Sequence, residues 1–563
     1  MQAPRSQQPA PQSGQPTPPV ADRELSPGVL LNPRAWTADA QRVLVPQVTG
    51  LLAKLHRQLE PQRQALLAAR REWQARMDSG ALPDYLDRLS PAVTGSWQVA
   101  PIPQDLLTRR VEITGPAHSA KMVINMLSRN AEGVRADTAM LDLEDAMHPW
   151  WGNVMAAVLN VKAAAEGTLT HAERGSQDLP GKLYRLDPQD RAVIIVRPRG
   201  LHLAEANFTV DGAPVSAALL DTVLTAWHAA PALVERGHTP AYYIPKTEHH
   251  GEAAWWSSLF AALEEALGLR RGTFKATFLI ETLPAAYEME EILHAAREHA
   301  VGLNVGRWDK IFSDIKTLRN HPDRVLADRA QITMTQPWMA SYALRCVAIS
   351  HARGAMGIGG MAAFTPGRTP EIRAAQTAKV VEDKRLENAR GHDGCWVSHP
   401  YFIGPALAQF PRANQLDRQA PAGDRFPDLL PRASGTQTLA GLRTNLRVGI
   451  GYLNGWNQHI ACVAWDNLME DLATLEISRA QTWQWLRYGV RLEEGQRVTA
   501  QLVRAVFQEE LEQICAEVAA DPDLSPAQRQ AQEQGFVRAA QDAQDIFTRD
   551  ELSEFLTLTS ERV

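Results

Sequence analysis

Short apolar runs alternate with longer helical stretches through the middle of the chain. Eight of these runs have the length and composition of buried strands. They cover residues 111–114, 140–143, 193–196, 242–244, 277–280, 301–303, 355–358 and 395–397. Eight strands alternating with helices over roughly 300 residues predict an α/β fold of the (β/α)₈ type, the TIM barrel. A doubly wound open sheet is the alternative, because one strand added or dropped would change the count.

The pattern changes on both sides of these runs. Between residues 33 and 89 apolar positions recur at helical spacing with few glycines, which predicts a helical segment. Toward the end of the chain Leu468, Leu472 and Leu475 would share one helix face, and residues 498–519 repeat that texture. We therefore expect five parts: a disordered Gln/Pro-rich tail (1–25), an N-terminal helical segment (26–105), the TIM barrel (106–410), a proline-rich linker (411–440) and a C-terminal helical domain (441–563).

Composition narrows the class of protein. The chain has 563 residues, of which 45% are apolar and 22% are charged, and this is ordinary for a large globular protein. Its 58 basic and 64 acidic residues give a net charge of −6. Because there is no basic excess, we expect neither nucleic acid nor an anionic membrane as a partner.

Cysteine usage and hydropathy indicate the compartment. No run approaches 18 apolar residues, and the start of the chain lacks the apolar stretch of a secretory signal. The four cysteines lie far apart without a CxxC motif, so neither a zinc cluster nor a disulfide framework is indicated: Cys346, Cys395, Cys462 and Cys515. These features predict a soluble protein of the reducing cytoplasm.

Charged residues stand where several predicted strands end: Asp142, Glu144, Asp145, Arg197, Arg199, Lys246, Glu248, Glu281 and Asp309. Barrel active sites form at the carboxyl ends of the strands. Asp309 follows Glu281 by 28 positions, about the length of one helix and two strand ends, so both acids should lie side by side at this edge. Mg²⁺ prefers oxygen ligands and usually takes one or two of them from protein. The pair therefore predicts a Mg²⁺ site, while a helix-terminal charge and a turn aspartate are the plain alternatives.

Other residues near these strand ends suit substrate binding. The backbone of Gly306, Arg307 and Trp308, just before Asp309, can offer N–H groups to a small anion beside the metal. Arg197, held by the following proline, can stabilise a developing oxyanion, although a salt bridge with a neighbouring acid is an equal alternative.

Six dispersed segments of the chain resemble malate synthase of the A type. The match runs from about Arg109 to Gln484 and follows the order of that family: 109–116, 197–200, 280–285, 297–309, 391–394 and 467–471. The resemblance implies a TIM barrel with an N-terminal helical clasp and a C-terminal helical plug. It also implies a transferase of the glyoxylate bypass that condenses acetyl-CoA with glyoxylate and hydrolyses malyl-CoA to malate and CoA.

The resemblance implies residue roles as well. Glu281 and Asp309 would hold Mg²⁺, and the backbone from Gly306 to Asp309 would receive the glyoxylate carboxylate. Asp471, which by pattern alone belongs to a solvated acidic pair, would be the base that removes a methyl proton from acetyl-CoA. Arg197 would stabilise the enolate.

Some positions depart from the family pattern. Lys310 replaces a usual tyrosine and Leu201 a common tryptophan, and residues 354–360 and 368–370 differ where we expect CoA contacts. Two alternatives therefore stand beside a malate synthase. One is a related barrel lyase or thioesterase acting on malyl-CoA or a similar hydroxyacyl-CoA, and the other is a non-catalytic CoA-binding protein.

Overall fold

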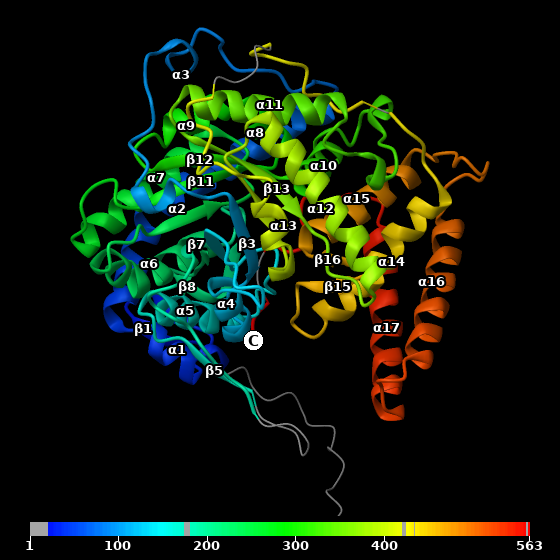
Figure 1. The fold of residues 1–563 in the computed structure, drawn as a ribbon, viewed down its shortest axis with the longest axis horizontal. Helices are drawn as coiled ribbons and strands as arrows, with labels where there is room; N and C mark the ends of the chain where they lie inside the picture. The colour runs from blue at the N-terminus through cyan, green and yellow to red at the C-terminus, as the bar shows by residue number, and fades with distance from the viewer. Residues whose placement is uncertain (1–20, 174–180, 419–423, 433, 559–560) are drawn as a thin grey trace, which may run out of the picture.

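Eight parallel strands close into a barrel (Figure 1). The computed structural model describes residues 21–173, 181–418, 424–432, 434–558 and 561–563. Around the barrel the strand order is β10-β11-β12-β13-β14-β3-β4-β7, and pairing of β7 with β10 completes the circle. The strands are β3 (Val111–Pro116), β4 (Thr138–Asp142), β7 (Val193–Arg197), β10 (Ala241–Ile244), β11 (Lys275–Ile280), β12 (Ala300–Val305), β13 (Met356–Ala362) and β14 (Gly394–Val397). Each of the eight predicted runs lies in one of these strands to within one residue, so the TIM barrel is confirmed and the open sheet is wrong.

Nearly every strand residue is buried, because side chains on one face fill the barrel and those on the other meet the surrounding helices. This explains the continuous apolar runs in the sequence. The helices that follow the barrel strands are α4 (Ala120–Leu127), α5 (Trp151–Ala165), α6 (Ala217–Glu235), α7 (His250–Leu267), α8 (Leu283–Tyr287), α9 (Met289–Ala295), α10 (Arg307–Thr317), α11 (Pro337–Ala352), α12 (Pro370–Arg390) and α13 (Ile403–Leu407).

Helix α6 is the one helix in the described part of the chain that is long and apolar enough to cross a membrane. Its apolar window has a mean hydropathy of 1.3, but 72% of that window is buried inside the protein. It packs against α5, α7 and the long N-terminal helix α2 (Pro46–Asp78). A helix buried to this extent inside the protein is typical of the core of a globular domain.

The N-terminal part contains strands that the sequence did not reveal. β1 (Arg23–Ser26) and β2 (Val29–Leu31) join β8 (Ala204–Val210) and β9 (Ala213–Ser216) in an antiparallel sheet beside the barrel. The disordered tail was expected to cover residues 1–25, but the residues from Arg23 onward belong to β1, so its end was placed too late. Residues 1–20 lie outside the described part. The remaining short elements before the barrel are α1 (Ala38–Val43) and α3 (Pro91–Thr94), and a β5–β6 hairpin (Thr170–Ala172, Leu183–Arg185) extends from the barrel.

The C-terminal domain is mainly helical, with α14 (Leu439–Trp456), α15 (Leu472–Arg487), α16 (Ala500–Ala520) and α17 (Pro526–Phe547). It also contains a hairpin of β15 (Val463–Trp465) and β16 (Leu468–Glu470). The expected shared helix face of Leu468 with Leu472 is therefore wrong. Asp466 and Asn467 adopt positive φ values of 47° and 64° in the hairpin turn, and Asp471 then caps α15.

Candidate active site

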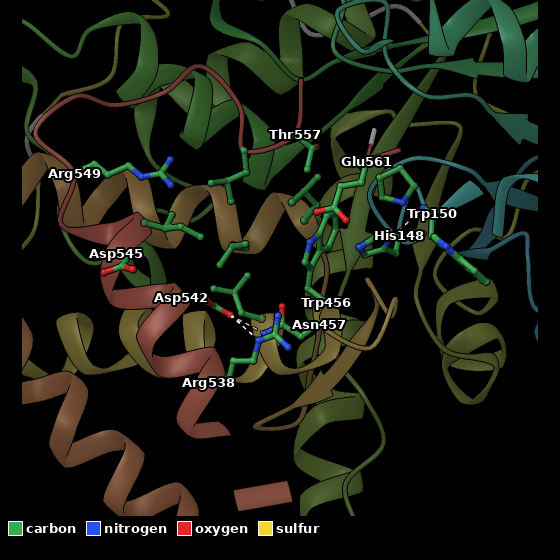
Figure 2. A pocket seen from close by; sticks show the side chains of 16 residues that line it. His148, Trp150, Trp456, Asn457, Arg538, Asp542, Asp545, Arg549, Thr557 and Glu561 are labelled. Atoms are coloured by element: carbon green, nitrogen blue, oxygen red, sulfur yellow. Dashed lines mark hydrogen bonds and ion pairs between the residues drawn. The ribbon is translucent and has the colours of Figure 1, made fainter. Parts of the chain in front are cut away.

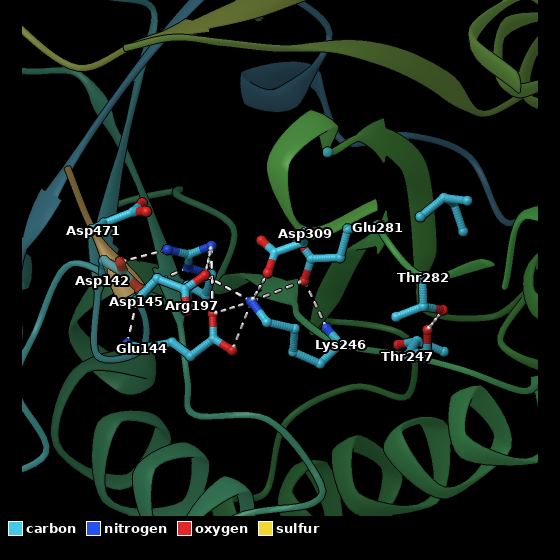
Figure 3. Close-up of polar contacts among 12 residues, drawn as sticks. Asp142, Glu144, Asp145, Arg197, Lys246, Thr247, Glu281, Thr282, Asp309 and Asp471 are labelled. Atoms are coloured by element: carbon cyan, nitrogen blue, oxygen red, sulfur yellow. Dashed lines mark hydrogen bonds and ion pairs between the residues drawn. The ribbon is translucent and has the colours of Figure 1, made fainter. Parts of the chain in front are cut away.

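Four carboxylates converge on the ammonium group of Lys246 at the carboxyl edge of the barrel (Figure 3). Lys246 Nζ lies 2.7 Å from Asp145 Oδ2 and 3.1 Å from Asp309 Oδ1. It also lies 3.2 Å from Glu144 Oε1 and 3.5 Å from Glu281 Oε1. The five side chains come from the ends of β4, β10, β11 and β12, and all are buried. No role for Lys246 follows from the sequence beyond its place at a strand end, because its own segment does not show which acids the neighbouring strands bring next to it.

The backbone of Lys246 is held from outside the barrel. Its φ is +52°, a conformation that residues other than glycine rarely adopt. Its N–H donates to Glu281 Oε1 at 2.7 Å, and its carbonyl accepts a 2.7 Å hydrogen bond from Arg70 Nη2 of α2. Arg70 is itself paired with Glu252 at 2.6 Å. The N-terminal helix thus fixes the residue at the centre of the cluster.

The structure brings Glu281 and Asp309 together. Glu281 follows β11 directly, and Asp309 lies in the first turn of α10, after the N-cap Gly306. A Cβ added at Gly306 would lie 2.7 Å from Glu281 Cβ and 3.1 Å from Glu281 Oε2. Glycine is therefore needed for this close approach of the two strand ends.

The two acids fit a hard divalent cation. Asp309 Oδ1 is buried and accepts no hydrogen bond from the described residues, although it faces Lys246. Burial raises the pKa of Asp309 well above its usual range and Glu281 adds repulsion, whereas Lys246 opposes both effects. Within the described ranges no group of three or more His, Cys, Asp or Glu side chains has metal-binding geometry. Two protein oxygens with open positions suit Mg²⁺ better than Zn²⁺.

Arg197 is locked in place by Asp142. Arg197 Nε and Nη2 donate to the two carboxylate oxygens of Asp142 at 2.7 and 2.5 Å. Asp142 also accepts the backbone N–H groups of Glu144 and Ala146. The third nitrogen, Nη1, faces the cluster, 3.5 Å from Glu144 Oε2 and 3.7 Å from Asp145 Oδ2. The salt-bridge alternative therefore holds, and it leaves one N–H edge directed at the site.

Asp471 reaches the cluster from the C-terminal domain. It is the N-cap of α15 and forms a capping box with Thr474. The N–H of the next residue, Leu472, donates to the carbonyl of Asp145 at 3.3 Å, which docks this helix end on the barrel. In Figure 3 Asp471 lies on the side of the cluster where Asp142 and Arg197 lie. Burial and the charge of Asp145 raise the pKa of Asp471 to about 7, and the cations of the cluster oppose this shift.

The side chains of Arg307 and Trp308 point elsewhere. Arg307 Nε and Nη2 donate to the carbonyl of Ile332 at 3.0 and 2.7 Å, and the guanidinium lies 4.3 Å from the Trp308 ring. The N–H of Gly306 already donates to Tyr342 Oη at 3.0 Å. What this turn can offer an anion is therefore the backbone N–H groups of the first turn of α10, which have no partner within the helix.

Comparison with known proteins identifies the family. The family description "Malate synthase, TIM barrel domain" matches residues 193–424, and the N-terminal and C-terminal malate synthase domains match residues 38–88 and 436–562. Malate synthase A of Escherichia coli (strain K12) is 41% identical over 537 residues, covering 94% of this chain and 97% of that protein. The malate synthases of Myxococcus xanthus (strain DK1622) and Streptomyces clavuligerus are each 43% identical, covering 88% and 86% of this chain and 90% of each relative.

The chain belongs to the malate synthase family. This confirms the resemblance seen in the sequence, together with the predicted malate synthase function and acyltransferase class. The three relatives are all named malate synthases, which favours this function over a lyase or thioesterase and over a non-catalytic CoA-binding protein.

Proposed function

We propose that the protein condenses acetyl-CoA with glyoxylate and hydrolyses the resulting malyl-CoA to malate and CoA. One observation carries this proposal. The barrel acids Glu281 and Asp309 lie in the same buried cluster as Arg197, and Asp471 of the C-terminal domain faces that cluster with a raised pKa. A cation site, an oxyanion partner and a base therefore meet where barrel and plug close on each other.

We propose that the cluster holds Mg²⁺ through Glu281 and Asp309, with water and glyoxylate oxygens as further ligands. Bound there, the ion would supply a Lewis acid that polarises the glyoxylate aldehyde. The chain itself contributes the preformed pair of oxygens, kept close by Gly306. Lys246 neutralises part of their charge.

Asp471 is the proposed base for the acetyl methyl group. A carboxylate with a pKa of about 7 is a stronger base than an ordinary aspartate and is still largely ionised at slightly alkaline pH. It takes one methyl proton, and the negative charge that develops on the thioester oxygen faces Arg197 Nη1. Because Asp142 fixes that guanidinium, little reorganisation is needed as the charge forms. The N-terminal turn of α10 binds the glyoxylate carboxylate.

The direct test is an assay of the purified protein with acetyl-CoA, glyoxylate and Mg²⁺, in which free thiol and malate are measured together. We expect equal amounts of CoA and malate, and no malate when glyoxylate is left out. Cleavage of malyl-CoA to acetyl-CoA and glyoxylate without malate formation would instead support a lyase. The absence of any reaction with either substrate set would overturn the enzymatic proposal.

We place the protein in the cytoplasm, with acetyl-CoA and glyoxylate as its small-molecule partners. All four cysteines are free, which agrees with a reducing compartment. The net charge of −6 gives no basic surface excess for nucleic acid.

A further inference from the structure

The chain after α17 returns to the barrel as a strap, defined here as residues 548–558. Figure 1 shows this part in red, running from α17 back toward the barrel. The strap has no regular secondary structure and its outer residues are exposed, but the side chains of Leu552 and Phe555 are only 6% and 9% exposed. Both side chains join an apolar cluster with barrel residues such as Phe312 and Trp338 and with Trp483 of α15. The strap is therefore packed between barrel and plug.

Hydrogen bonds attach the strap to α15, the helix that Asp471 caps. Glu476 Oε1 accepts the N–H of Leu556 at 2.8 Å, and Arg479 Nη2 donates to the carbonyl of Ser553 at 3.0 Å. Glu476 and Arg479 are themselves a buried ion pair. On the barrel side, the N–H of Ala204 donates to the carbonyl of Leu558 at 3.0 Å.

Phe555 points from the strap toward the carboxylate cluster. Its ring centroid lies 4.1 Å from that of His202 and 5.6 Å from that of Phe312, and Lys316 Nζ is 5.0 Å from it. The ring lines a small cavity of about 10 Å³ together with Lys246, Glu281 and Asp309. It also lines a cavity of about 30 Å³ that Glu144, Asp145 and Leu472 border.

The strap lies between these inner cavities and a larger one of about 440 Å³ (Figure 2). The large cavity lies between barrel residues 148–150 and helices of the plug, and Figure 2 shows His148 and Trp150 across from Asp545 and Arg549. Leu556 of the strap lines the large cavity, Phe555 lines the two inner cavities, and Thr557 borders both the large cavity and one of the inner ones. One thin layer of chain thus stands between this space and the acids.

We propose that Phe555 is a positioning residue of the reaction, which seals the carboxylate cluster against water where barrel and plug meet. This inference rests on the proposed function. A sealed site keeps the newly formed enolate away from solvent, so that it attacks glyoxylate and is not reprotonated. Removing the ring would join the inner cavities and admit water beside Lys246. The proton that Asp471 has taken would then exchange with solvent, and the methyl carbon would regain a hydrogen from water.

The test measures this leak by running the reaction in D₂O. Deuterium in the recovered acetyl-CoA, divided by malate formed, gives the exchange per turnover. We expect Phe555→Ala to raise this ratio at least tenfold over wild type and to lower kcat by a similar factor, with a smaller change in the KM for glyoxylate. Phe555→Leu, which refills most of the space, should restore both values to within about threefold. If Phe555→Ala does not fold, Phe555→Val must show the same direction of change.

Phe507→Ala is the matched control, because Phe507 is equally apolar and buried but lies in the core of α14, α16 and α17. It should lower the melting temperature without changing the exchange ratio. An unchanged ratio in the Phe555 variants, or an equal rise in Phe507→Ala, would overturn the sealing role. A wild-type protein that makes no malate would count against the proposed function, and this result is distinct from either of those.

Discussion

Two of the buried clusters of charged residues in the barrel differ in their balance of charge. The inner cluster lies near the start of the strands and joins one cation to one anion, Arg109 and Glu112. Arg109 Nε lies 2.5 Å from Glu112 Oε1, and its other nitrogens donate to Thr277 Oγ1 at 2.8 Å and Tyr243 Oη at 2.6 Å. Trp396 Nε1 donates to the remaining Glu112 oxygen at 2.7 Å. Every charge in this cluster has a matching partner.

The cluster at the carboxyl ends of the strands has far more acids than cations. Six carboxylates face two cations, which leaves a formal excess of four negative charges: Asp142, Glu144, Asp145, Glu281, Asp309 and Asp471 against Arg197 and Lys246. The raised pKa values of Asp309 and Asp471 are a consequence of burial together with this excess. A balanced cluster stabilises a fold, whereas an unbalanced one indicates a site that receives a cation and carries out proton transfer.

The largest effect should come from the acid on the plug. We expect Asp471→Asn to lower kcat by roughly 10²–10⁴-fold, because an amide cannot take the methyl proton. Steady-state kinetics measures the loss, and calorimetry should show that Mg²⁺ still binds. Asp466→Asn, five positions earlier in the exposed hairpin turn, is the control and should keep wild-type turnover. Near-normal turnover of Asp471→Asn would refute its assignment as the base.

A substitution in the cluster of Arg109 and Glu112 should lower the stability of the protein. Glu112→Gln leaves the buried Arg109 without its counter-charge, so the free energy of unfolding should fall by about 3–5 kcal/mol. Urea denaturation measures the change. Mg²⁺ affinity should stay as in wild type, since Glu112 is not part of the cluster at the barrel mouth. A weaker Mg²⁺ affinity with unchanged stability would reverse the roles that we give to the two clusters.

Glu281→Gln should show the opposite behaviour. It removes one of the two proposed metal carboxylates, so Mg²⁺ affinity should fall about tenfold or more. The melting temperature without Mg²⁺ should be unchanged or higher than in wild type, because the substitution reduces the excess negative charge. Titration calorimetry and differential scanning calorimetry test the two statements separately. Wild-type Mg²⁺ affinity in this variant would exclude Glu281 as a ligand.

The smallest effect concerns pH. The proposed base works only when ionised, so kcat/KM should fall about tenfold per pH unit below the Asp471 pKa of about 7 and level off above it. Asp145→Asn removes the negative charge that raises the Asp471 pKa and should move this inflection to lower pH. A pH–rate profile of both proteins measures the shift. An inflection that stays in place would mean that another group controls the profile.

The barrel was predictable because strands buried on both faces leave short apolar runs, and eight such runs alternate with helical stretches. The pairing of Glu281 with Asp309 was predictable too, since one helical crossover fixes the distance along the chain between neighbouring strand ends. By contrast, β1 and β2 are only four and three residues long, and their hairpin joins a sheet through β8, which lies far away in sequence, so no local period marks them.

The rest of the site depends on contacts between distant segments. Lys246 is one of several strand-end charges in the sequence, and only the closed barrel directs it at four acids at once. The backbone N–H groups before Asp309 were expected to bind the substrate anion, and this stays a prediction. The sequence did not reveal that the side chains of Arg307 and Trp308 contact a loop that follows α10. Phe555 carries no sequence signal at all, because an isolated phenylalanine after the last helix resembles any core residue.

The order of segments along the chain has a consequence for biosynthesis. A ribosome completes all eight barrel strands once Val397 has been made, yet Asp471 and Phe555 follow only later. Until they emerge, the nascent barrel exposes an acidic mouth that can attract cations but lacks the proposed base opposite it. The proposed reaction can therefore begin only after the ribosome has passed Phe555.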